Sequence, residues 1–413
     1  MRRQVRDWLD EHWDPERPLL EWRSLLADAG WGCPSWPVGT FGRGLDARAA
    51  AVVHEELARA GAVGPASGSA MSLAAPTILE HGSAALHQRL LRPIVTGEHT
   101  WCQLFSEPGN GSDVAGLTTR AERDGDEWVV DGQKLWTTGA HRASYGMLLA
   151  RTDWDVPKHR GITYFALPMR QPGVEVRSVR QMNGHASFNE VFLTGARVPH
   201  DNVIGEVGGG WSVALTTLAH ERGLTPARVV RADGDAPGRT VQEATAEAAE
   251  YAKTYVWYPQ RAGRPDLVRT RAAATSQDHD PLIRQHLATV TSLDRMVRWS
   301  AERARARRAL GRPPGAEGSL AKLAASSVAR ASSTAHSAIG GASAMLTSAD
   351  APEVAVVAEV LVSVPAVSIA GGTDEIQRTI IGERVLGLPK EPGSDTKVPF
   401  REVRTNRRTG AGT

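Results

Sequence analysis

The sequence predicts an α+β protein in which strands occupy the middle of the chain and helices lie on either side of them. Apolar residues recur at helical spacing over roughly the first hundred residues. Short strand-like runs replace this pattern from Cys102 to about Gly208, and helical spacing returns from Gly209 to Leu388. A chain of 413 residues suits two or three domains of about 150 residues each. We therefore expect a helical domain over 1–101, a β domain over 102–208, a helical domain over 209–390 and a flexible tail over 391–413.

Composition narrows the class of protein. The chain is 41% hydrophobic and 23% charged, which is typical of a globular protein, and its net charge of +2 does not favour nucleic acid or an anionic membrane as a partner. Cys33 and Cys102 lack the spacing of metal or redox motifs, which favours a reducing, cytoplasmic compartment. No apolar run follows the basic N-terminus, and we identify none near the ~20 residues that span a membrane. We expect a soluble protein.

The first hundred residues are expected to form packing helices without chemistry. Val5, Leu9 and their neighbours fall at helical spacing, and Asp46 is suited to cap a later helix. Gly30–Gly44 is rich in Gly and Pro and is expected to be irregular. Further helices are expected over Leu19–Ala29, Asp46–Ala60, Pro76–His81 and Ala84–Gly97.

The β region begins with a turn-rich loop, Ser106–Asp113, whose glycines allow other groups to approach the main chain closely. Asp124-Gly125 signals a hairpin, and two successive strands are expected over Glu127–Asp131 and Lys134–Thr138. The second would present an indole and two hydroxyls to a planar heterocycle. Further strands are expected over Tyr145–Arg151, Gly161–Leu167, Val174–Val179 and Glu190–Leu193.

In the second helical region, Gly263–Asp280 is expected to interrupt the helices, and Arg312–Gly315 to separate two of them. The basic run Arg298–Arg308 is interpreted as the solvated face of a long helix, with contact to carrier phosphates or an acidic carrier protein as the alternative. No metal is expected, because the histidines lack paired ligand spacing. We find no nucleophile triad and no Walker or Rossmann fingerprint.

Three separated motifs carry a resemblance to a known family. The loop SEPGNGSD, the strand WTT and the late segment GGTDEIQRTIIGERVLGLP occur in the order and spacing of the FAD-dependent acyl-CoA dehydrogenases, and the match extends to about Lys390. The resemblance implies an N-terminal helical domain, a middle β-barrel or sandwich domain and a C-terminal four-helix bundle. It also implies a homotetramer or heterotetramer that passes electrons to an electron-transfer flavoprotein.

The activity implied by the resemblance is α,β-dehydrogenation of an acyl thioester, held on coenzyme A or on an acyl-carrier protein. A base removes the α proton while the β hydrogen leaves as hydride to flavin N5. The base must have a raised pKa, and hydrogen bonds must stabilise the developing enolate. Many family members place a Glu where this sequence has Gly371. Others place the base before an Arg on the first helix after the β domain, which implies Glu221 as base and Arg222 as its support. Gly371 would still offer its backbone N–H.

The resemblance also implies residues that bind FAD. Phe105 and Ser106 would contact the pyrimidine edge, Trp136 one flavin face, and Thr138 the region of N5. Thr373 and Glu375 would lie toward the pyrophosphate and adenosine, although many members have an amide at the second position. Thr373 with its acidic neighbours is equally read as a helix cap. Ser337, Gly340 and Gly341 match a segment that wraps the FAD of a neighbouring subunit, and alternatively mark a helix kink or end.

Two serines match further positions of the family, and one family motif has no counterpart in this sequence. Ser112 and Ser187 match positions that touch the acyl carrier, or are ordinary loop serines. The family's Arg-Phe-Gly, which reaches another subunit's FAD, has no clean counterpart near Arg269, Arg271 and Thr275. Two alternatives therefore stay open. One is a flavin-dependent oxidase or monooxygenase on the same fold, and the other is a non-catalytic partner subunit of a heteromeric dehydrogenase.

Overall fold

The computed structural model describes most of the chain, and the statements below concern those residues alone. They are residues 1–222, 238–310, 316–346 and 352–390, followed by 393, 395 and 397–403. The expected break at 312–315 lies outside them.

The chain forms two compact units, whose membership differs from the predicted boundaries. Unit 1 contains Met1–Val179, Ser187–Thr254 and Gly393–Thr413, and unit 2 contains Arg180–Ala186 and Tyr255–Pro392. The first helices after the strands therefore pack with unit 1, whereas we had expected the helical domain to begin at residue 209. The connection between the sixth and seventh strands belongs to unit 2.

The helices of the first hundred residues follow the predicted pattern closely. Val5 and Leu9, four residues apart, are both buried in α1, and the Asp46 carboxylate accepts a hydrogen bond from Ala49 N at 2.8 Å, so the predicted cap is confirmed. The helices of unit 1 are α1 (Arg2–His12), α2 (Leu19–Asp28), α3 (Ala47–Arg59), α4 (Ala75–His81), α5 (Ala84–Leu86), α6 (Arg92–Thr96), α7 (Gly210–Arg222) and α8 (Arg239–Lys253), with π-helical turns η1 (Ala70–Ala74) and η2 (His87–Leu91).

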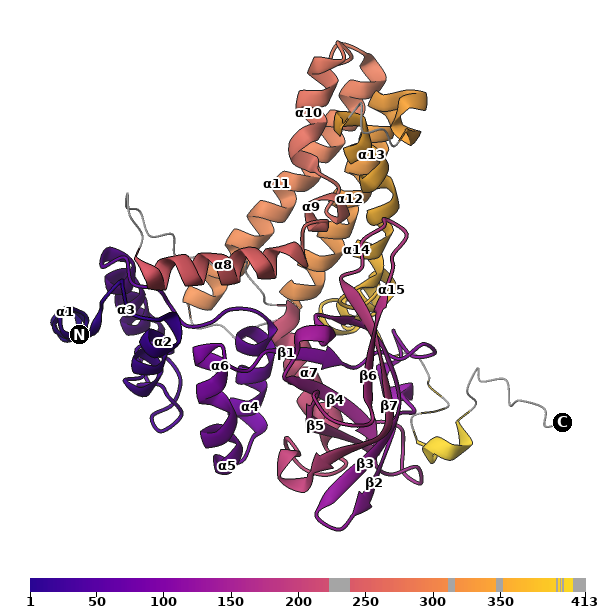
Figure 1. The fold of residues 1–413 in the computed structure, drawn as a ribbon. Helices are drawn as coiled ribbons and strands as arrows, with labels where there is room; N and C mark the ends of the chain where they lie inside the picture. The colour runs from indigo at the N-terminus through magenta and orange to yellow at the C-terminus, as the bar shows by residue number, and fades with distance from the viewer. Residues whose placement is uncertain are drawn as a thin grey trace. The chain divides into compact units, whose positions relative to one another are not determined.

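A curled, mostly antiparallel sheet of seven strands forms the centre of unit 1 (Figure 1). The strand order is β1-β4-β2-β3-β7-β6, and β5 pairs with β4 outside this path. Only the pairings of β4 with β1 and with β2 are parallel among the described strands. The strands are β1 (Trp101–Leu104), β2 (Arg120–Asp124), β3 (Glu127–Thr138), β4 (Tyr145–Arg151), β5 (Ile162–Pro168), β6 (Val174–Val179) and β7 (Phe188–Pro199).

The strand predictions hold with one correction. The hairpin at Asp124-Gly125 is confirmed by the antiparallel pairing of β2 with β3. The two strands expected over Glu127–Asp131 and Lys134–Thr138 are instead one strand, β3, because both halves pair with β7 across register shifts. Gly132 occupies the first shift, where an added Cβ would lie 2.4 Å from Thr119 Oγ1, so the strand continues there only because the residue is glycine.

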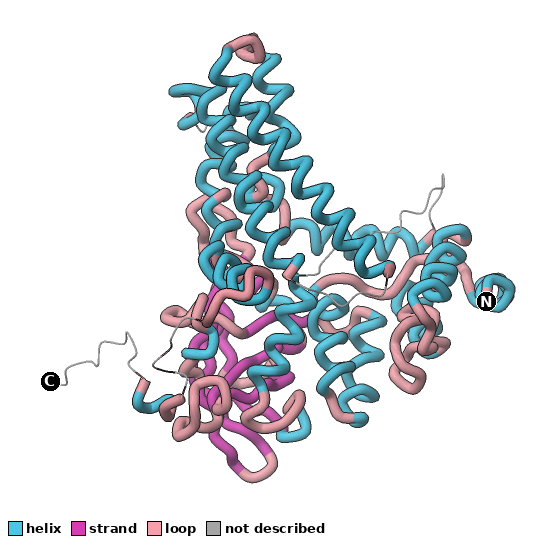
Figure 2. The backbone as a smooth tube through the Cα atoms, turned by 180° about the vertical axis from the view of Figure 1, so that it is seen from behind, coloured by secondary structure: helices cyan, strands magenta, loops and turns pink. Residues whose placement is uncertain are grey.

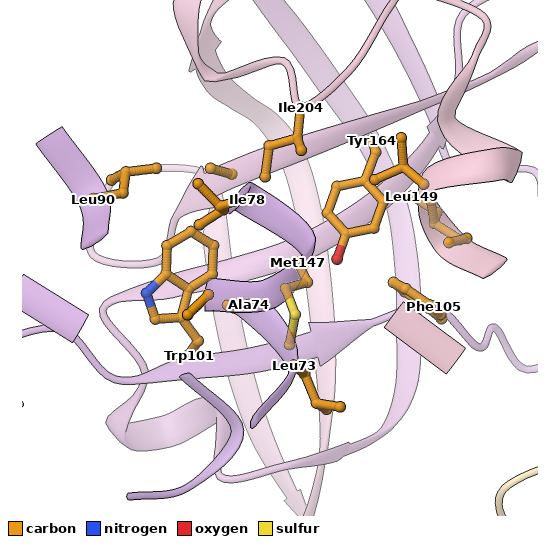
Figure 3. Close-up of a cluster of buried hydrophobic side chains, with 14 of the residues drawn as sticks. Leu73, Ala74, Ile78, Leu90, Trp101, Phe105, Met147, Leu149, Tyr164 and Ile204 are labelled. Atoms are coloured by element: carbon orange, nitrogen blue, oxygen red, sulfur yellow. The ribbon is translucent and has the colours of Figure 1, made fainter. Parts of the chain in front are cut away.

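The main core of unit 1 lies between the sheet and the helices that precede it. Figure 3 shows side chains of η1, α4 and η2 meeting side chains of β1, β4 and β5. Trp101, Met147 and Tyr164 contribute from the strands, while Leu73 and Ile78 contribute from the helical side. Each large apolar side chain buried in this way stabilises the fold by about 1.5–3 kcal/mol relative to exposure. The helices from η1 onward thus share one core with the sheet, whereas α1, α2 and α3 form a separate hydrophobic cluster of their own.

Unit 2 is helical, and its long helices α11 and α12 run side by side (Figure 2). One correction concerns Gly263–Asp280, which we expected to interrupt the helices and which contains helix α10. Pro265 begins this helix, and Val268 and Ala272 are buried four residues apart. The helices are α9 (Tyr258–Arg261), α10 (Pro265–Ala274), α11 (Pro281–Ala309), α12 (Glu317–Gly340), α13 (Pro352–Ser363), α14 (Pro365–Ile369) and α15 (Asp374–Arg384).

The basic run on α11 is solvated as predicted, since Arg298, Arg303 and Arg305 are exposed. A second expectation requires correction. One run, Ala355–Arg384, is long and apolar enough to cross a membrane by length and composition, although we had identified none. Such a run is weak support for a span, and here it comprises parts of three helices: α13 ends at Ser363, α14 at Ile369, and α15 begins at Asp374.

The described part of the C-terminal segment is also held more firmly than expected for a flexible tail over 391–413. Phe400 is 2% exposed, and a short 3-10 helix, η7 (Phe400–Glu402), follows Pro399. Pro399 forms a β-bridge with Pro157, so this segment packs on the strand region of unit 1. No sequence pattern predicted this contact, because a single buried aromatic residue gives no periodic signal in a polar sequence.

Candidate functional site

The loop Ser106–Asp113 begins directly after β1 and closes on itself. Glu107 and Asn110 exchange backbone hydrogen bonds of 3.0 and 3.1 Å, and the Ser106 carbonyl accepts one from Leu135 N at 2.9 Å. Phe105 is buried and packs edge-on against Tyr164, with ring centroids 5.8 Å apart. Ser106 is half-buried. The loop is thereby fastened to strand β3 beside Leu135.

A buried ion pair that we did not anticipate holds this loop. Lys134 Nζ lies 3.0 Å from Glu107 Oε1 and 3.1 Å from the Phe105 carbonyl, and neither charged side chain is more than 6% exposed. The same carboxylate accepts hydrogen bonds from Thr118 N at 2.8 Å and Thr119 N at 2.7 Å. Both residues stood in the motifs, but no spacing rule in the sequence pairs them.

Protonation of this pair follows from its surroundings. Burial alone would raise the pKa of Glu107, but the Lys134 ammonium and the hydroxyl and amide donors of Thr118 and Thr119 outweigh it and lower the pKa to about 2. Burial lowers the pKa of Lys134, and Glu107 opposes that effect. We take the pair as ionised, because the carboxylate has several donors and the ammonium has two acceptors.

Trp136 is presented outward by an irregularity in β3. The register with β7 shifts between Lys134 and Thr137, and Trp136 has a φ of +61°. A left-handed conformation costs a non-glycine residue about 1–3 kcal/mol and is concentrated at functional sites. The indole is 54% exposed and touches Phe188 edge-on, at a centroid distance of 5.7 Å. The bulge therefore directs a large planar side chain away from the core of unit 1.

Thr138 and Ser187 lie next to each other across the same strand pair. Thr138 faces Phe188 in the register of β3 with β7, and Ser187 directly precedes Phe188. Both serine and threonine are half-buried. Thr137 lies between Trp136 and Thr138 in β3. It is 1% exposed, and its hydroxyl has no hydrogen-bond partner in the described structure. Trp136, Thr138 and Ser187 thus lie where β3 ends and β7 begins, and Ser106 is bonded to Leu135 in the same part of β3.

Glu221 lies in the last turn of α7 and reaches strand β1. Gln103 Nε2 donates to Glu221 Oε2 at 3.4 Å, and Gln103 precedes Phe105 by two residues. The Glu221 side chain is half-buried. The structure therefore brings the predicted base to the strand that leads into the Ser106–Asp113 loop. Sequence reasoning missed Gln103, since an amide on a strand carries no motif.

A chain of buried hydroxyls anchors α7 one turn before Glu221. Thr217 Oγ1 lies 2.9 Å from Thr77 Oγ1 on α4 and 3.1 Å from Tyr164 Oη on β5, and all three residues are fully buried. Burial raises the pKa of Tyr164 beyond any working pH, so the phenol stays neutral. The helix that carries Glu221 is thus held from two sides.

Two further predicted residues are Arg222 and Ser112. Arg222 is the last residue of α7, and its side chain lies outside the described part of the structure. Ser112 is exposed in the loop, next to Asp113, whose carboxylate pairs with Lys158 at 3.0 Å. Neither arrangement by itself distinguishes a functional residue from an ordinary loop or helix residue.

In unit 2, Gly371 and Thr373 shape the turn into α15. Gly371 has a φ of +69° and Gly372 of +85°, and the Gly371 carbonyl accepts a hydrogen bond from Gln377 Nε2 at 2.9 Å. Thr373 is the N-cap of α15, its hydroxyl accepting from Ile376 N at 3.3 Å. The predicted cap is confirmed. The turn presents a helix N-terminus, which suits a phosphate.

The two acidic residues after this cap behave differently. Asp374 is 3% exposed and pairs with Lys322, at 2.9 Å, and with Arg330, both on α12. Its pKa is lowered, because these cations and Ser326 outweigh the effect of burial. Glu375 is exposed and pairs with Arg378 within the same helix, at 3.3 Å. Of the two, Asp374 fixes α15 and Glu375 remains at the surface.

The other predicted cofactor residues of unit 2 lie at the far end of α12. Ser337 is half-buried and its hydroxyl donates to the Ser333 carbonyl at 3.0 Å. Gly340 ends the helix and Gly341, with a φ of +51°, caps it, so the helix-end interpretation is confirmed. Gly340 follows Arg330 by ten residues, or about 15 Å of helix. The Thr373 turn and the glycine pair therefore form two separate places in unit 2.

Each unit, taken by itself, offers groups of the kind that bind one part of a flavin dinucleotide. Unit 1 supplies an exposed indole on a strained bulge together with hydroxyls from Ser106 and Thr138. The unpartnered Thr137 hydroxyl beside them is an orphaned polar group of the kind a bound molecule satisfies. Unit 2 supplies a helix N-terminus for phosphate. Among the described residues, no group of three or more His, Cys, Asp or Glu could hold a metal ion.

Comparison with known proteins supports the same assignment. Family models match residues 1–98 as an acyl-CoA dehydrogenase N-terminal domain, 102–195 as its middle domain and 265–386 as its C-terminal domain. The acyl-CoA dehydrogenase IpdE1 of Mycobacterium tuberculosis is 34% identical over 94% of this chain and 97% of its own length. FadE34 of the same organism is 38% identical over 88% of this chain, which spans only 46% of the length of FadE34.

Solved structures agree with these matches. The ChsE4–ChsE5 complex of Mycobacterium tuberculosis has a TM-score of 0.64 at 26% identity, covering 94% of this chain and 97% of that one. A variant of the Tcur3481–Tcur3483 steroid ACAD has a TM-score of 0.63 at 25% identity, covering 94% of this chain and 98% of that one. By its three domains and its relatives, the chain belongs to the acyl-CoA dehydrogenase family, oxidoreductases that act on CH–CH donors.

Proposed function

We propose that the protein is an FAD-dependent dehydrogenase that introduces an α,β double bond into an acyl thioester, with Glu221 as the base. The observation that carries this proposal is the placement of the Glu221 carboxylate at 3.4 Å from Gln103, on the strand that continues into Phe105 and Ser106. The relatives named acyl-CoA dehydrogenases support the reaction class. Gly371, where many family members carry the base, has no side chain that could accept a proton.

Two features of Glu221 suit it to take the α proton. Its carboxylate sits at the end of a helix that Thr217, Thr77 and Tyr164 fix in place, which limits the reorganisation needed when the proton is transferred. Gln103 donates a hydrogen bond to one carboxylate oxygen and so helps to orient the group, and an ionised carboxylate has further lone pairs with which to accept a proton. The enolate that develops at the thioester needs backbone donors, and the Gly371 N–H is our candidate for that role.

FAD would be held by residues from several parts of the chain. Phe105, Ser106, Trp136 and Thr138 would surround the ring system, the N-terminus of α15 at Thr373 would meet the pyrophosphate, and Glu375 would lie toward the adenosine. Ser337, Gly340 and Gly341 would serve the FAD of a neighbouring subunit, which suits their separation along α12 from the Thr373 turn. When bound, FAD supplies the two-electron acceptor for the β hydrogen.

The substrate would be an acyl thioester on coenzyme A or on an acyl-carrier protein, with Ser112 and Ser187 near its thioester and carrier. One structural relative is a steroid ACAD, so we include polycyclic acyl groups among the candidates. We further propose a tetrameric assembly and an electron-transfer flavoprotein as acceptor. Cys33 and Cys102 are buried free thiols, which suits a cytoplasmic enzyme.

The test is anaerobic titration of the purified flavoprotein with a panel of acyl-CoA and acyl-carrier-protein thioesters. We expect one substrate class to bleach the flavin absorbance. In Glu221→Gln the bleaching rate should fall by about 10²–10⁴-fold, the contribution of a catalytic base, because an amide cannot accept the proton. Glu206→Gln is the matched control, since Glu206 is exposed in the loop before α7, and it should bleach at the wild-type rate.

Other outcomes separate the alternatives. A reduced flavin that reacts rapidly with oxygen would favour an oxidase or monooxygenase on this fold. A colourless protein that gains a flavin spectrum only with a partner chain would favour a partner subunit. Unchanged bleaching in Glu221→Gln would rule out Glu221 as the base.

A further inference from the structure

The C-terminal segment returns to the strand region and packs against the loop that follows β4. Phe400 N donates to the Val156 carbonyl at 2.9 Å and Arg401 N donates to the Trp154 carbonyl at 3.0 Å. The Arg401 guanidinium also pairs with Asp155. Main-chain and side-chain contacts together hold residues 399–401 in one register. This segment belongs to the same compact unit as the sheet.

Phe400 completes the surroundings of a buried arginine. Its ring lies 3.5 Å from Arg151 Cζ and 5.5 Å, between centroids, from Trp154, and Arg151 is fully buried. A guanidinium stacked on an aromatic face away from water gains a cation–π interaction. Burial lowers the pKa of Arg151 to about 10, which leaves it charged at neutral pH.

Arg151 in turn holds the segment that follows the Ser106–Asp113 loop. Its guanidinium donates to the carbonyls of Ala115 at 2.7 Å, Leu117 at 3.2 Å and Lys158 at 3.1 Å. Its backbone N donates to the Thr119 carbonyl at 2.7 Å. A single side chain under Phe400 therefore fixes three carbonyls, two of which lie between Asp113 and the Glu107-bound residues Thr118 and Thr119.

A second bridge runs parallel to the first. Lys158 Nζ contacts both carboxylate oxygens of Asp113, at 3.0 and 3.1 Å, and Asp395 Oδ2 at 2.6 Å. Asp113 ends the loop that contains Ser106 and Ser112, while Asp395 belongs to the C-terminal segment. The lysine is 8% exposed, so this bridge is partly shielded from water. Both ends of the 113–117 stretch are thus linked to the C-terminal segment.

From these contacts we infer that the described C-terminal residues, 395 and 397–403, position the 106–119 segment for the acyl thioester, with Phe400 and Asp395 acting through Arg151 and Lys158. The inference rests on the proposed function of that loop and extends it. Phe400 and Asp395 are positioning residues, because the contacts described for them go to Arg151, Lys158 and the loop after β4, and not to the predicted flavin or acyl-carrier residues. The segment thereby adds a C-terminal element to the support of a loop that lies in the first third of the chain.

The experiment compares Phe400→Ala, Phe400→Tyr and Asp395→Asn in the full-length flavoprotein. Hydrogen exchange is followed at the amides of Gly116, Leu117, Thr118 and Thr119, all of which donate hydrogen bonds in the structure. In Phe400→Ala we expect these amides to exchange about tenfold faster, because Arg151, which holds the Ala115 and Leu117 carbonyls in the same stretch, loses the ring stacked on it. Phe400→Tyr retains the ring and should restore wild-type exchange. Lys397→Ala is the control, since Lys397 is exposed in the same segment.

Steady-state kinetics with a thioester that bleaches the flavin provides the second readout. Phe400→Ala and Asp395→Asn should raise KM about fivefold with kcat changed less than about twofold, since the loop binds the carrier and Glu221 carries the chemistry. A variant that merely lowered the amount of folded enzyme would lower apparent kcat and leave KM unchanged. Asp395→Asn alters one hydrogen bond at the surface and keeps the inference testable if Phe400→Ala does not fold.

One result would overturn the inference directly. The amides of Phe400 and Arg401 report release of the segment itself, because they donate to Val156 and Trp154. If these two lose protection while Gly116–Thr119 keep theirs, and KM is unchanged, the segment does not position the loop. The exchange measurement requires no turnover, so its outcome stands even if Glu221→Gln shows that the proposed reaction is wrong.

Discussion

Two buried carboxylates, Glu107 and Asp374, stand beside two predicted parts of the cofactor site and are held in different ways. The partners of Glu107 follow it by 11 to 27 residues and lie within the same loop and strand. The partners of Asp374 precede it by 44 and 52 residues and lie on another helix. The first carboxylate determines the conformation of its own loop, whereas the second docks α15 on α12.

Their exposure to solvent differs as well. Lys134, the cation for Glu107, is fully buried, whereas the Arg330 side chain that pairs with Asp374 is 45% exposed. Removing the only cation beside a buried carboxylate lowers the free energy of unfolding by several kcal/mol. The loss is smaller where water reaches the pair and a second cation remains. Among the described residues, Glu107 thus pairs with one cation, Lys134, whereas Asp374 pairs with two, Lys322 and Arg330.

The largest expected effect is that of Lys134→Met, which leaves the Glu107 carboxylate buried without its cation. We expect local stability of the 107–119 segment to fall by about 3–5 kcal/mol, measured by hydrogen exchange at Thr118 and Thr119. Flavin retention after gel filtration should fall with it. Lys253→Met is the control, because Lys253 is exposed and pairs only with Glu250 among the described residues. A loss below about 1 kcal/mol would show that the buried pair does not hold the loop.

A second prediction concerns acid. The pKa of Glu107 is lowered from 4.5 to about 2, so the folded state favours the ionised carboxylate. Its contribution is therefore fully present above pH 4.5 and is lost as the pH falls toward 2, with a total of about 3 kcal/mol. The free energy of unfolding of wild type minus that of Glu107→Gln should be constant above about pH 5 and shrink below it. A difference that grows toward low pH would contradict the assignment.

The smallest of the three effects is expected for Lys322→Met, because Arg330 still pairs with Asp374. Local stability at the start of α15 should fall by about 1–2 kcal/mol, measured by exchange at the Ile376 and Gln377 amides. Glu375→Gln alters the exposed residue next to Asp374 and serves as the control. It should change the local stability at the start of α15 by less than about 0.5 kcal/mol. If Lys322→Met proved more damaging than Lys134→Met, the contrast between the two carboxylates would be reversed.

Much of the site could be predicted where each residue follows a local rule. Thr373 caps α15 as its acidic neighbours suggested, and Gly341 ends α12. The sequence identified Trp136 as a residue that could face a planar ligand. It did not reveal the β-bulge that turns the indole outward. A bulge depends on the register of β3 against β7, which pairs residues about fifty positions apart. No pattern within β3 alone reveals such a shift.

The interactions that organise the site were the hardest to predict. Gln103 and Glu221 are separated by 118 residues, and Asp395 and Lys158 by 237. Each contact joins ordinary polar residues whose types recur throughout the chain. The sequence could place Glu221 on a helix near its end, but only the packing of α7 on β1 and β5 determined what its carboxylate meets.

The sequence by itself determined the order of helices and strands, the caps and the hairpin, because periodicity and turn chemistry act between residues close together in the chain. Only the tertiary structure decided that α7 belongs with the strands, that Lys134 lies buried against Glu107, and that Phe400 packs over Arg151. These depend on which surfaces meet after folding. Burial then strengthens the effect of one ion pair or one aromatic ring on stability, although nothing in the neighbouring sequence distinguishes these residues from others of the same type.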